Sequence, residues 1–233
     1  DKNISVYAHL SRFRPDIADW FEKRAYNLQR NNLDLFPRIN QFPVKRGTLI
    51  GWSGTSGAST GPHLHLEIRN PANELINPIG FFSVPDTMPP VIDEVIIKES
   101  NGHLVKAVRD TFFISSTIAY ISACIYDRAI FPENKLAPLQ MSVRNERGDF
   151  FQMDFRKFSF AQNPSVVRHS NRTLQKLYQK KYHRFWIEPN NKAPFYSGKA
   201  ITQFPEGISE LYFQAIDYTG KTSFKRYIIK VQV

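Results

Sequence analysis

Two histidines with one residue between them, His63 and His65, are the side chains of this chain best suited to chemistry. They open the segment His63–Arg69, in which polar and apolar residues alternate as they do in a half-buried β-strand. Since successive side chains of a strand point to opposite faces, both imidazoles are expected on one face, together with Glu67. Two histidines so placed can approach one metal ion. A bare His-x-His pair also arises by chance, so it needs support from elsewhere in the chain.

A third histidine, His9, lies in a second predicted strand, Ile4–Leu10, where it is expected to share a face with Tyr7. Before the His63 strand comes a loop rich in glycine, serine and threonine. Its glycines permit backbone conformations closed to other residues and the close approach of a peptide. A phosphate-binding loop is excluded, because no Lys-Ser/Thr pair and no helix follow it.

Together these segments resemble the M23 family of zinc metallopeptidases, the lysostaphin-like or LytM-like cell-wall endopeptidases. The resemblance covers about residues 4–80, and the layout of the chain is similar to envelope M23 proteins of the Bacteroidetes type. It rests on Tyr7-Ala8-His9-Leu10, Val44-Lys45-Arg46-Gly47-Thr48-Leu49-Ile50-Gly51, Gly54-Thr55-Ser56-Gly57, Thr60-Gly61-Pro62-His63-Leu64-His65-Leu66-Glu67-Ile68-Arg69 and Asn77-Pro78.

The resemblance implies a role for each histidine. His65 matches a zinc ligand, and His63 and His9 match the two catalytic histidines that assist the metal-bound water and stabilise the oxyanion. The implied cofactor is Zn²⁺, and the implied reaction is hydrolysis of the peptide cross-links of peptidoglycan. Glu67 either orients a ligand histidine or pairs with Arg69, and substrate-binding residues are not assigned.

The family also has a His and an Asp ligand upstream of the strand that carries His9. Only eight residues precede His9, and they contain Asp1 but no histidine. Catalytic zinc usually needs three protein ligands. Three explanations are open for these two ligands. The segment that carries them is a separate or cleaved fragment, or it belongs to a longer gene product of which this chain is a part. Alternatively, the protein is a degenerate homologue that binds cell wall or regulates another hydrolase without cutting. We expect the missing ligands upstream of Asp1, and this chain alone to be inactive and to hold zinc weakly or not at all.

The predicted fold class is mainly β, with two domains. Residues 1–84 form the C-terminal part of an M23-like peptidase domain, an antiparallel sheet with a helical insertion at 15–42. In this insertion Pro15 suits the first turn of a helix that runs to Arg30. The helix either caps the sheet, burying Trp20 and Phe21, or forms a lid over a substrate groove.

Three prolines at 85–90 predict a linker, because proline ends helices and central strands. Residues 91–233 show short strands separated by turns, which predicts a β-sandwich accessory domain that is Ig-like. The expected elements are strands at 91–97, 112–116, 118–125, 139–143, 150–155, 210–216 and 221–233 and one helix at 172–181.

The chain has 233 residues, a formal charge of +10, six histidines and one cysteine. A single cysteine excludes an intrachain disulfide and a Cys-rich zinc site. Cys124 lies in an apolar strand and is expected to be buried. The remaining histidines, His103, His169 and His183, are expected to be structural or on the surface.

The positive charge belongs mainly to the second half, which carries a net +7 against +3 for residues 1–85. It favours either weak binding of an anionic envelope polymer or merely a dispersed, solvated surface. No motif supports nucleic-acid binding. A cell-wall substrate implies an exported protein of the periplasm or cell envelope, and the expected partners are a peptidoglycan peptide and the missing N-terminal segment.

Overall fold

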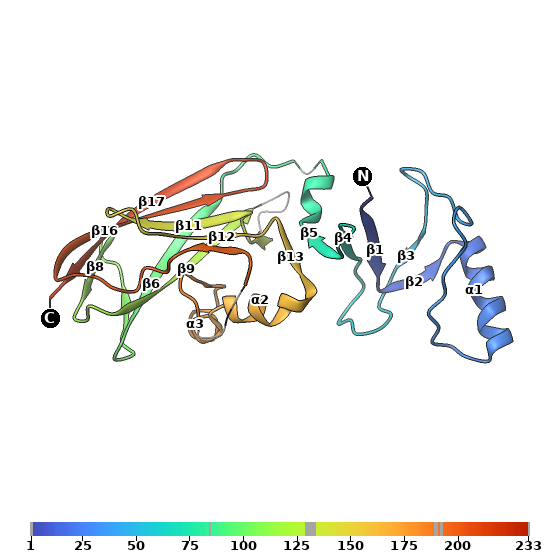
Figure 1. Ribbon diagram of the computed structural model, residues 1–233, viewed down its shortest axis with the longest axis horizontal. Coiled ribbons are helices and arrows are strands. Elements are labelled where there is room, and N and C mark those ends of the chain that lie inside the picture. The colour runs from blue at the N-terminus through green and yellow to red at the C-terminus, as the bar shows by residue number, and fades with distance from the viewer. Residues whose placement is uncertain (1, 84, 129–133, 189–190, 192, 233) are drawn as a thin grey trace. The chain divides into compact units, whose positions relative to one another are not determined.

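A computed structural model describes residues 2–83, 85–128, 134–188, 191 and 193–232. The fold is mainly β, as the sequence predicts, with 42% of residues in strands and 15% in helices. The chain divides into two compact units, Asp1–Arg69 and Asn70–Val233 (Figure 1).

Unit 1 contains two small antiparallel pairings. Strand β1 (Ile4–Ala8) pairs with β4 (His65–Arg69), with Ala8 opposite His65 and Val6 opposite Glu67. Strand β2 (Leu10–Phe13) pairs with β3 (Gly51–Ser53), and helix α1 (Pro15–Leu28) follows β2. The helix begins and ends close to the predicted bounds, with Pro15 in its first turn. Residues 44–50 are not in a strand, and β3 begins at Gly51.

Unit 1 buries little apolar surface. Among its described residues Ile68 is the only hydrophobic side chain in the buried class. Large apolar side chains elsewhere in the unit are exposed, such as Ile39 at 94%, Phe36 at 89% and Ile4 at 55%. Strand β1 also stands at the end of its sheet. Unit 1 therefore combines an end strand with exposed apolar side chains.

Unit 2 is built on two sheets. One has the strand order β10-β9-β6-β7, with β14 also paired to β9, and the other has the order β15-β12-β11-β16-β17-β8. The pairings are antiparallel except that of β17 with β8, which is parallel. The strands are β6 (Val91–Glu99), β7 (Leu104–Lys106), β8 (Thr111–Ile114), β9 (Ala119–Arg128), β10 (Lys135–Leu136), β11 (Gln140–Asn145), β12 (Phe150–Asp154), β14 (His183–Arg184), β15 (Tyr196–Gly198), β16 (Gly207–Ile216) and β17 (Thr222–Val231).

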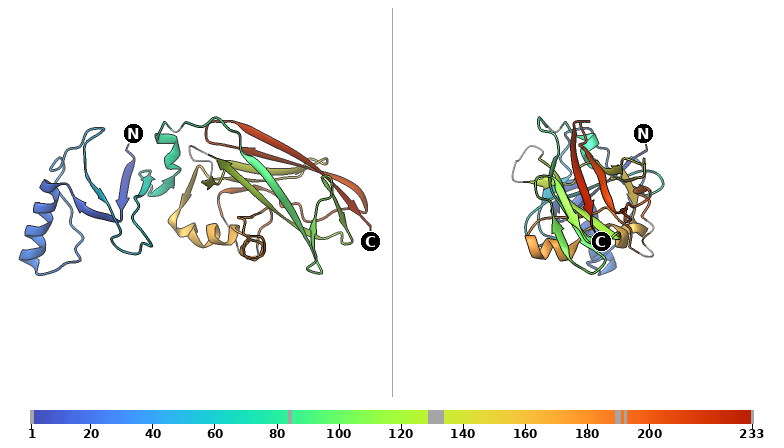
Figure 2. Two further views of the ribbon diagram at one scale, coloured as in Figure 1. Left: turned by 180° about the vertical axis from the view of Figure 1, so that it is seen from behind. Right: turned by 90° about the vertical axis from the view of Figure 1, so that its left-hand side faces the viewer.

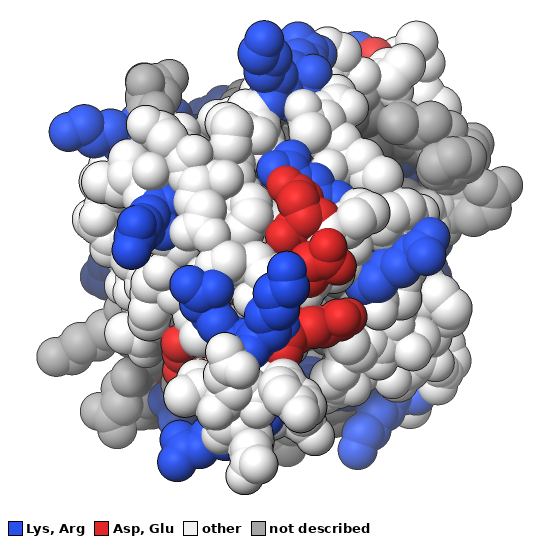
Figure 3. Space-filling view, turned by 90° about the vertical axis from the view of Figure 1, so that its right-hand side faces the viewer, with Lys and Arg blue, Asp and Glu red and all other residues white. Residues whose placement is uncertain are grey.

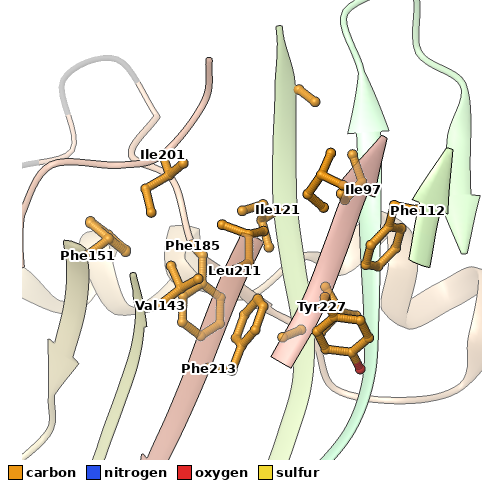
Figure 4. Packing of buried hydrophobic residues seen from close by; sticks show 14 of the residues in the cluster. Ile97, Phe112, Ile121, Val143, Phe151, Phe185, Ile201, Leu211, Phe213 and Tyr227 are labelled. Atoms are coloured by element: carbon orange, nitrogen blue, oxygen red, sulfur yellow. The ribbon is translucent and has the colours of Figure 1, made fainter. Parts of the chain in front are cut away.

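The two sheets share one apolar core (Figure 4). Ile97 and Ile121 come from the sheet that contains β6 and β9, while Val143 and Phe213 come from β11 and β16. All four are 0% exposed. Because strand side chains alternate, one face of each sheet is free to supply this core, which accounts for the alternating pattern along β16.

Short helices cover the other face of the smaller sheet. Helix α2 (Asn163–His169) and helix α3 (Arg172–Tyr178) lie together beside the sheets (Figures 1 and 2). Leu174 of α3 packs in a second buried cluster with Ile96, Cys124 and Tyr182. The helix expected at 172–181 is therefore found, three residues shorter, whereas α2 was not predicted.

The division between the units lies earlier than the predicted linker at 85–90. Strand β5 (Glu74–Ile76) pairs with β13 (Lys157–Ser159), and a 3₁₀ turn, η1 (Pro78–Phe81), follows it. The carbonyl of Phe82 then accepts a hydrogen bond from the Tyr218 hydroxyl. A second 3₁₀ turn, η2 (Phe160–Gln162), follows β13. Residues 70–90 are thus bound to unit 2, and the prolines occur within this attached segment.

Among the described residues, no helix has the length and apolar character needed to cross a membrane. On the face drawn in Figure 3, lysine and arginine side chains are dispersed among uncharged ones, with acidic side chains near the middle. That face offers no continuous basic surface.

Candidate functional site

Unit 1 brings together the three histidines singled out in the sequence. The ring centroid of His9 lies 4.7 Å from that of His63 and 5.7 Å from that of His65. His65 begins β4, His9 lies between β1 and β2, and His63 forms an isolated bridge with Gly54. Two separate backbone segments, one with His9 and the other with His63 and His65, therefore meet at one cluster, which we call the histidine cluster.

His9 reaches the cluster by a route that the sequence prediction missed. Strand β1 ends at Ala8 rather than Leu10, and His9 has a φ of 59°, in the left-handed region. In a continuous strand His9 would share a face with Tyr7, opposite to the face shared by the cross-strand pair Ala8 and His65. The left-handed residue breaks that alternation. The predicted sharing of one strand face by Tyr7 and His9 is therefore wrong, while the proximity of the three histidines holds.

Gly54 holds the backbone of His63 in place. The amide N–H of His63 donates to the carbonyl of Gly54 over 3.1 Å. A Cβ atom on Gly54 would lie 2.6 Å from Cβ of Ser11 and 2.8 Å from its backbone nitrogen, which leaves no room for a side chain. The glycine loop thus acts on the cluster through its backbone. His63 lies just outside β4, so the strand begins two residues later than predicted.

Backbone carbonyls fix the tautomers of His9 and His63. Nδ1 of His9 lies 2.7 Å from the carbonyl oxygen of Ser56, and Nδ1 of His63 lies 2.8 Å from that of Gly61. A carbonyl oxygen only accepts, so in both rings Nδ1 carries the proton and donates it. The neutral form of each histidine then has an unprotonated Nε2. Nε2 is the atom that can accept a proton in acid–base chemistry.

His65 is held through its Nε2 atom rather than through Nδ1. Its Nε2 lies 2.9 Å from Oε1 of Glu67, whose other oxygen, Oε2, accepts from Arg69. Glu67 therefore does both of the things considered for it, since it orients the ring of His65 and also pairs with Arg69. Burial raises the pKa of Glu67, but the hydrogen bonds from Arg69 and His65 outweigh this and the net pKa is lowered. The ionised Glu67 fixes the proton of His65 on Nε2 and leaves Nδ1 as the donor atom for a metal.

The donor atoms of the histidine cluster fit part of a zinc site. A His that donates its second N–H to a carboxylate is the usual arrangement of a metal ligand, so His65 fits. Catalytic zinc usually needs three protein ligands. Within the described part of the chain, the histidine cluster does not provide three ligand atoms within 4.8 Å of one another. These residues can hold part of a zinc site, and Asp1 lies outside the described residues.

The histidines of unit 2 have structural roles, as expected. His169 is buried and His183 is half-buried, and Nε2 of His169 lies 2.7 Å from Nδ1 of His183. His103 is exposed over 69% of its side chain and pairs with Glu99. Cys124 is buried, and burial raises its pKa to about 11, which makes it unreactive as a thiol.

The insertion at 15–42 is less buried than a simple cap would be. None of the residues of α1 is in the buried class, and Trp20 and Phe21, which the cap alternative would bury, are half-buried. Trp20 contacts Phe42 edge-on at 5.5 Å between ring centroids, and Phe21 lies 6.2 Å from Phe13. The helix is held to unit 1 by these aromatic contacts and leaves much of its surface open.

Comparison of the chain with protein-family models, with curated proteins and with solved structures finds no match in any of the three. The functional interpretation therefore rests on the residues and on the geometry of the histidine cluster.

Proposed function

We propose that the protein containing this chain is an M23-type zinc metalloendopeptidase that hydrolyses the peptide cross-links of peptidoglycan. The observation that carries the proposal is the histidine cluster, in which His9 lies beside His63 and His65 from a distant segment and each ring is fixed by a specific partner. Histidines that lie close together only by chance would not each need a partner that fixes the ring.

Each residue of the cluster then has one task. His65 contributes Nδ1 to the metal, and Glu67 holds its ring and tautomer. His9 and His63 offer Nε2 for proton transfer, and once protonated they stabilise negative charge on the substrate oxygen. Zinc, when bound, supplies Lewis acidity toward the scissile carbonyl and lowers the pKa of its water. The other zinc ligands, a His and an Asp, would come from polypeptide outside the described residues.

The setting of the cluster agrees with a peptide substrate. His63 and His65 are exposed, so a large polymer can reach them. The protein would then be exported and act in the periplasm or cell envelope. Unit 2 would serve as an accessory domain of the Ig-like sandwich type, and weak binding of an anionic envelope polymer would hold the enzyme near its substrate.

One observation favours a second candidate function. Because the described residues offer fewer than three zinc ligand atoms at the histidine cluster, the chain suits a non-catalytic role in which unit 1 binds cell-wall peptide or regulates a hydrolase.

Peptidoglycan digestion separates the two candidates. The natural gene product is incubated with purified peptidoglycan, and released peptides are followed by mass spectrometry. An enzyme cleaves cross-links and is inactivated by His65→Ala and by a zinc chelator. The matched control is His103→Gln, an exposed histidine of unit 2, which is expected to retain full activity. Activity that survives His65→Ala would overturn the assignment, and binding without cleavage would support the second candidate.

A further inference from the structure

A cluster of three aspartates lies in unit 2, far in sequence from the histidine cluster. Asp86 belongs to the segment before β6, Asp127 lies near the end of β9, and Asp217 follows β16. One carboxylate oxygen from each lies within 4.8 Å of the other two. We call these residues the aspartate cluster. They come from three separate parts of unit 2, so the fold itself brings the charges together.

Asp217 carries an oxygen that has no hydrogen-bond partner. The residue is 0% exposed. Its Oδ1 accepts from the amides of Thr219 and Lys221, whereas Oδ2 is buried and receives no hydrogen bond. The nearest cation, Nζ of Lys221, is 3.8 Å from Oδ2, beyond hydrogen-bond distance. The ion pair with Lys221 therefore leaves this buried oxygen without a hydrogen bond, although buried polar atoms normally have one.

The charges around the cluster do not balance. Lys221 is the cation that the structure sets against the three carboxylates, and its Nζ also lies 3.4 Å from Oδ2 of Asp86. The side chain of Asp86 is only 2% exposed and Asp127 is 7% exposed, so solvent compensates little of the remaining charge. Burial, together with the charge of Asp86, raises the pKa of Asp127 to about 6, as expected beside uncompensated carboxylates.

The chemistry and spacing favour calcium. Carboxylate oxygens are the ligands of hard divalent cations. Two oxygens bound to the same Ca²⁺, each at about 2.4 Å, lie at most about 4.8 Å apart, so the spacing of the aspartate cluster is compatible with this ion. Ca²⁺ accepts several carboxylates in irregular geometry, whereas Mg²⁺ requires near-octahedral geometry and usually binds only one or two carboxylates. We propose that Asp86, Asp127 and Asp217 bind a calcium ion that joins the segment before β6 to both sheets of unit 2.

The position of the cluster gives the ion a structural task. The segment that leads into β6 runs beside the turn between β16 and β17 (Figures 1 and 2). The Thr219 hydroxyl donates to Asp86 over 3.5 Å, and the Ser223 hydroxyl donates to the carbonyl of Pro90. Calcium would add ionic bonds from β9 to these weak contacts and fix the proline-rich segment against unit 2.

Calorimetric titration of the full chain with CaCl₂ at pH 7.5 tests the proposal, with MgCl₂ in a parallel run. We expect one Ca²⁺ per chain, weaker binding of Mg²⁺, and a melting temperature that rises with calcium concentration. Asp127→Asn should weaken calcium binding at least tenfold. Lys221→Gln, which removes the competing cation, should retain or tighten it. Circular dichroism confirms that each variant is folded.

The control is Asp93→Asn, which removes an aspartate that pairs with Lys180 and lies outside the cluster. It is expected to bind calcium as the unmodified chain does. Absence of calcium binding by the folded unmodified chain would overturn the proposal, and so would an equal loss in Asp93→Asn and Asp127→Asn, which would mean binding to general surface charge. The outcome is independent of the histidine cluster, because His65→Ala leaves the aspartates unchanged.

Discussion

Acid should destabilise unit 2 through its histidine pair. Nε2 of His183 lies 3.0 Å from the carbonyl oxygen of Ile125, which only accepts, so this nitrogen carries the proton. Nδ1 of His183 then accepts from Nε2 of His169, whose Nδ1 accepts from the Tyr196 hydroxyl at 3.2 Å. This chain of hydrogen bonds is complete with both rings neutral. A further proton on either ring would place a charge in this desolvated pair, which is why burial lowers both pKa values.

The size of the effect follows from the pKa of His183, which burial lowers from 6.5 to about 4. The unfolded chain takes up its proton near pH 6.5 and the folded chain only near pH 4. Stability from the neutral pair is therefore complete above pH 6.5 and is lost as the pH falls from 6.5 toward 4. At about 1.4 kcal/mol for each pH unit between the two pKa values, the loss is about 3 kcal/mol. Burial also lowers the pKa of His169 well below its usual value, which acts in the same direction.

The assay is urea unfolding of the chain and of His183→Gln, followed by circular dichroism between pH 7.5 and pH 4. Asp127, with its raised pKa of about 6, acts in the opposite direction, but it is present in both proteins and cancels in their difference. The variant should be the less stable at pH 7.5, and its deficit should shrink by about 3 kcal/mol at pH 4. The His103→Gln control retains the pair of His169 and His183, so it should lose as much stability between pH 7.5 and pH 4 as the unmodified chain. A difference that does not change with pH would refute the neutral-pair account.

Three further predictions concern the site and the core. Gly54→Ala should displace His63 and lower peptidase activity of the natural gene product at least tenfold, whereas Gly61→Ala, with open space around its Cβ position, should leave activity unchanged. Glu67→Gln should weaken zinc binding by about 10- to 100-fold, measured by competition with a chelating dye, because the carboxylate that orients the ligand His is lost. Phe213→Ala should lower the free energy of unfolding of unit 2 by about 3–5 kcal/mol in urea titrations, because the side chain is wholly buried. Unchanged activity, unchanged zinc affinity or a cost below 1 kcal/mol would contradict the respective argument.

The sequence predicts unit 2 better than unit 1, and the reason is burial. The alternation along 210–216 reports a strand with one face in a shared core, and β16 is found there with Leu211, Phe213 and Ala215 fully buried. Among the described residues of unit 1, Ile68 is the only buried hydrophobic side chain, so hydrophobic patterning carries little information about its strands. Strand β3 is accordingly only three residues long.

Within the site, residue types were predictable and backbone conformation was not. The spacing of His63 and His65 indicates a shared location, but the left-handed φ of His9 has no signal in the sequence, since histidine rarely adopts it. The carbonyls of Ser56 and Gly61 that fix the tautomers also belong to the backbone and leave no mark on residue type.

The proximity of the three aspartates could not be predicted from the sequence for a different reason. Its three members lie far apart along the chain and occur in ordinary turn and strand-end contexts, where Asp is common. Only the packing of β9 and of the β16–β17 turn beside the segment before β6 brings their carboxylates together.

The zinc content of the natural gene product tests the central claim most directly. The purified protein and its His65→Ala variant are dialysed against zinc-free buffer and analysed by mass spectrometry of the metal. The proposed site predicts about one zinc per chain in the unmodified protein and almost none in the folded variant. Equal zinc in the two proteins would contradict the assignment of His65 as a ligand.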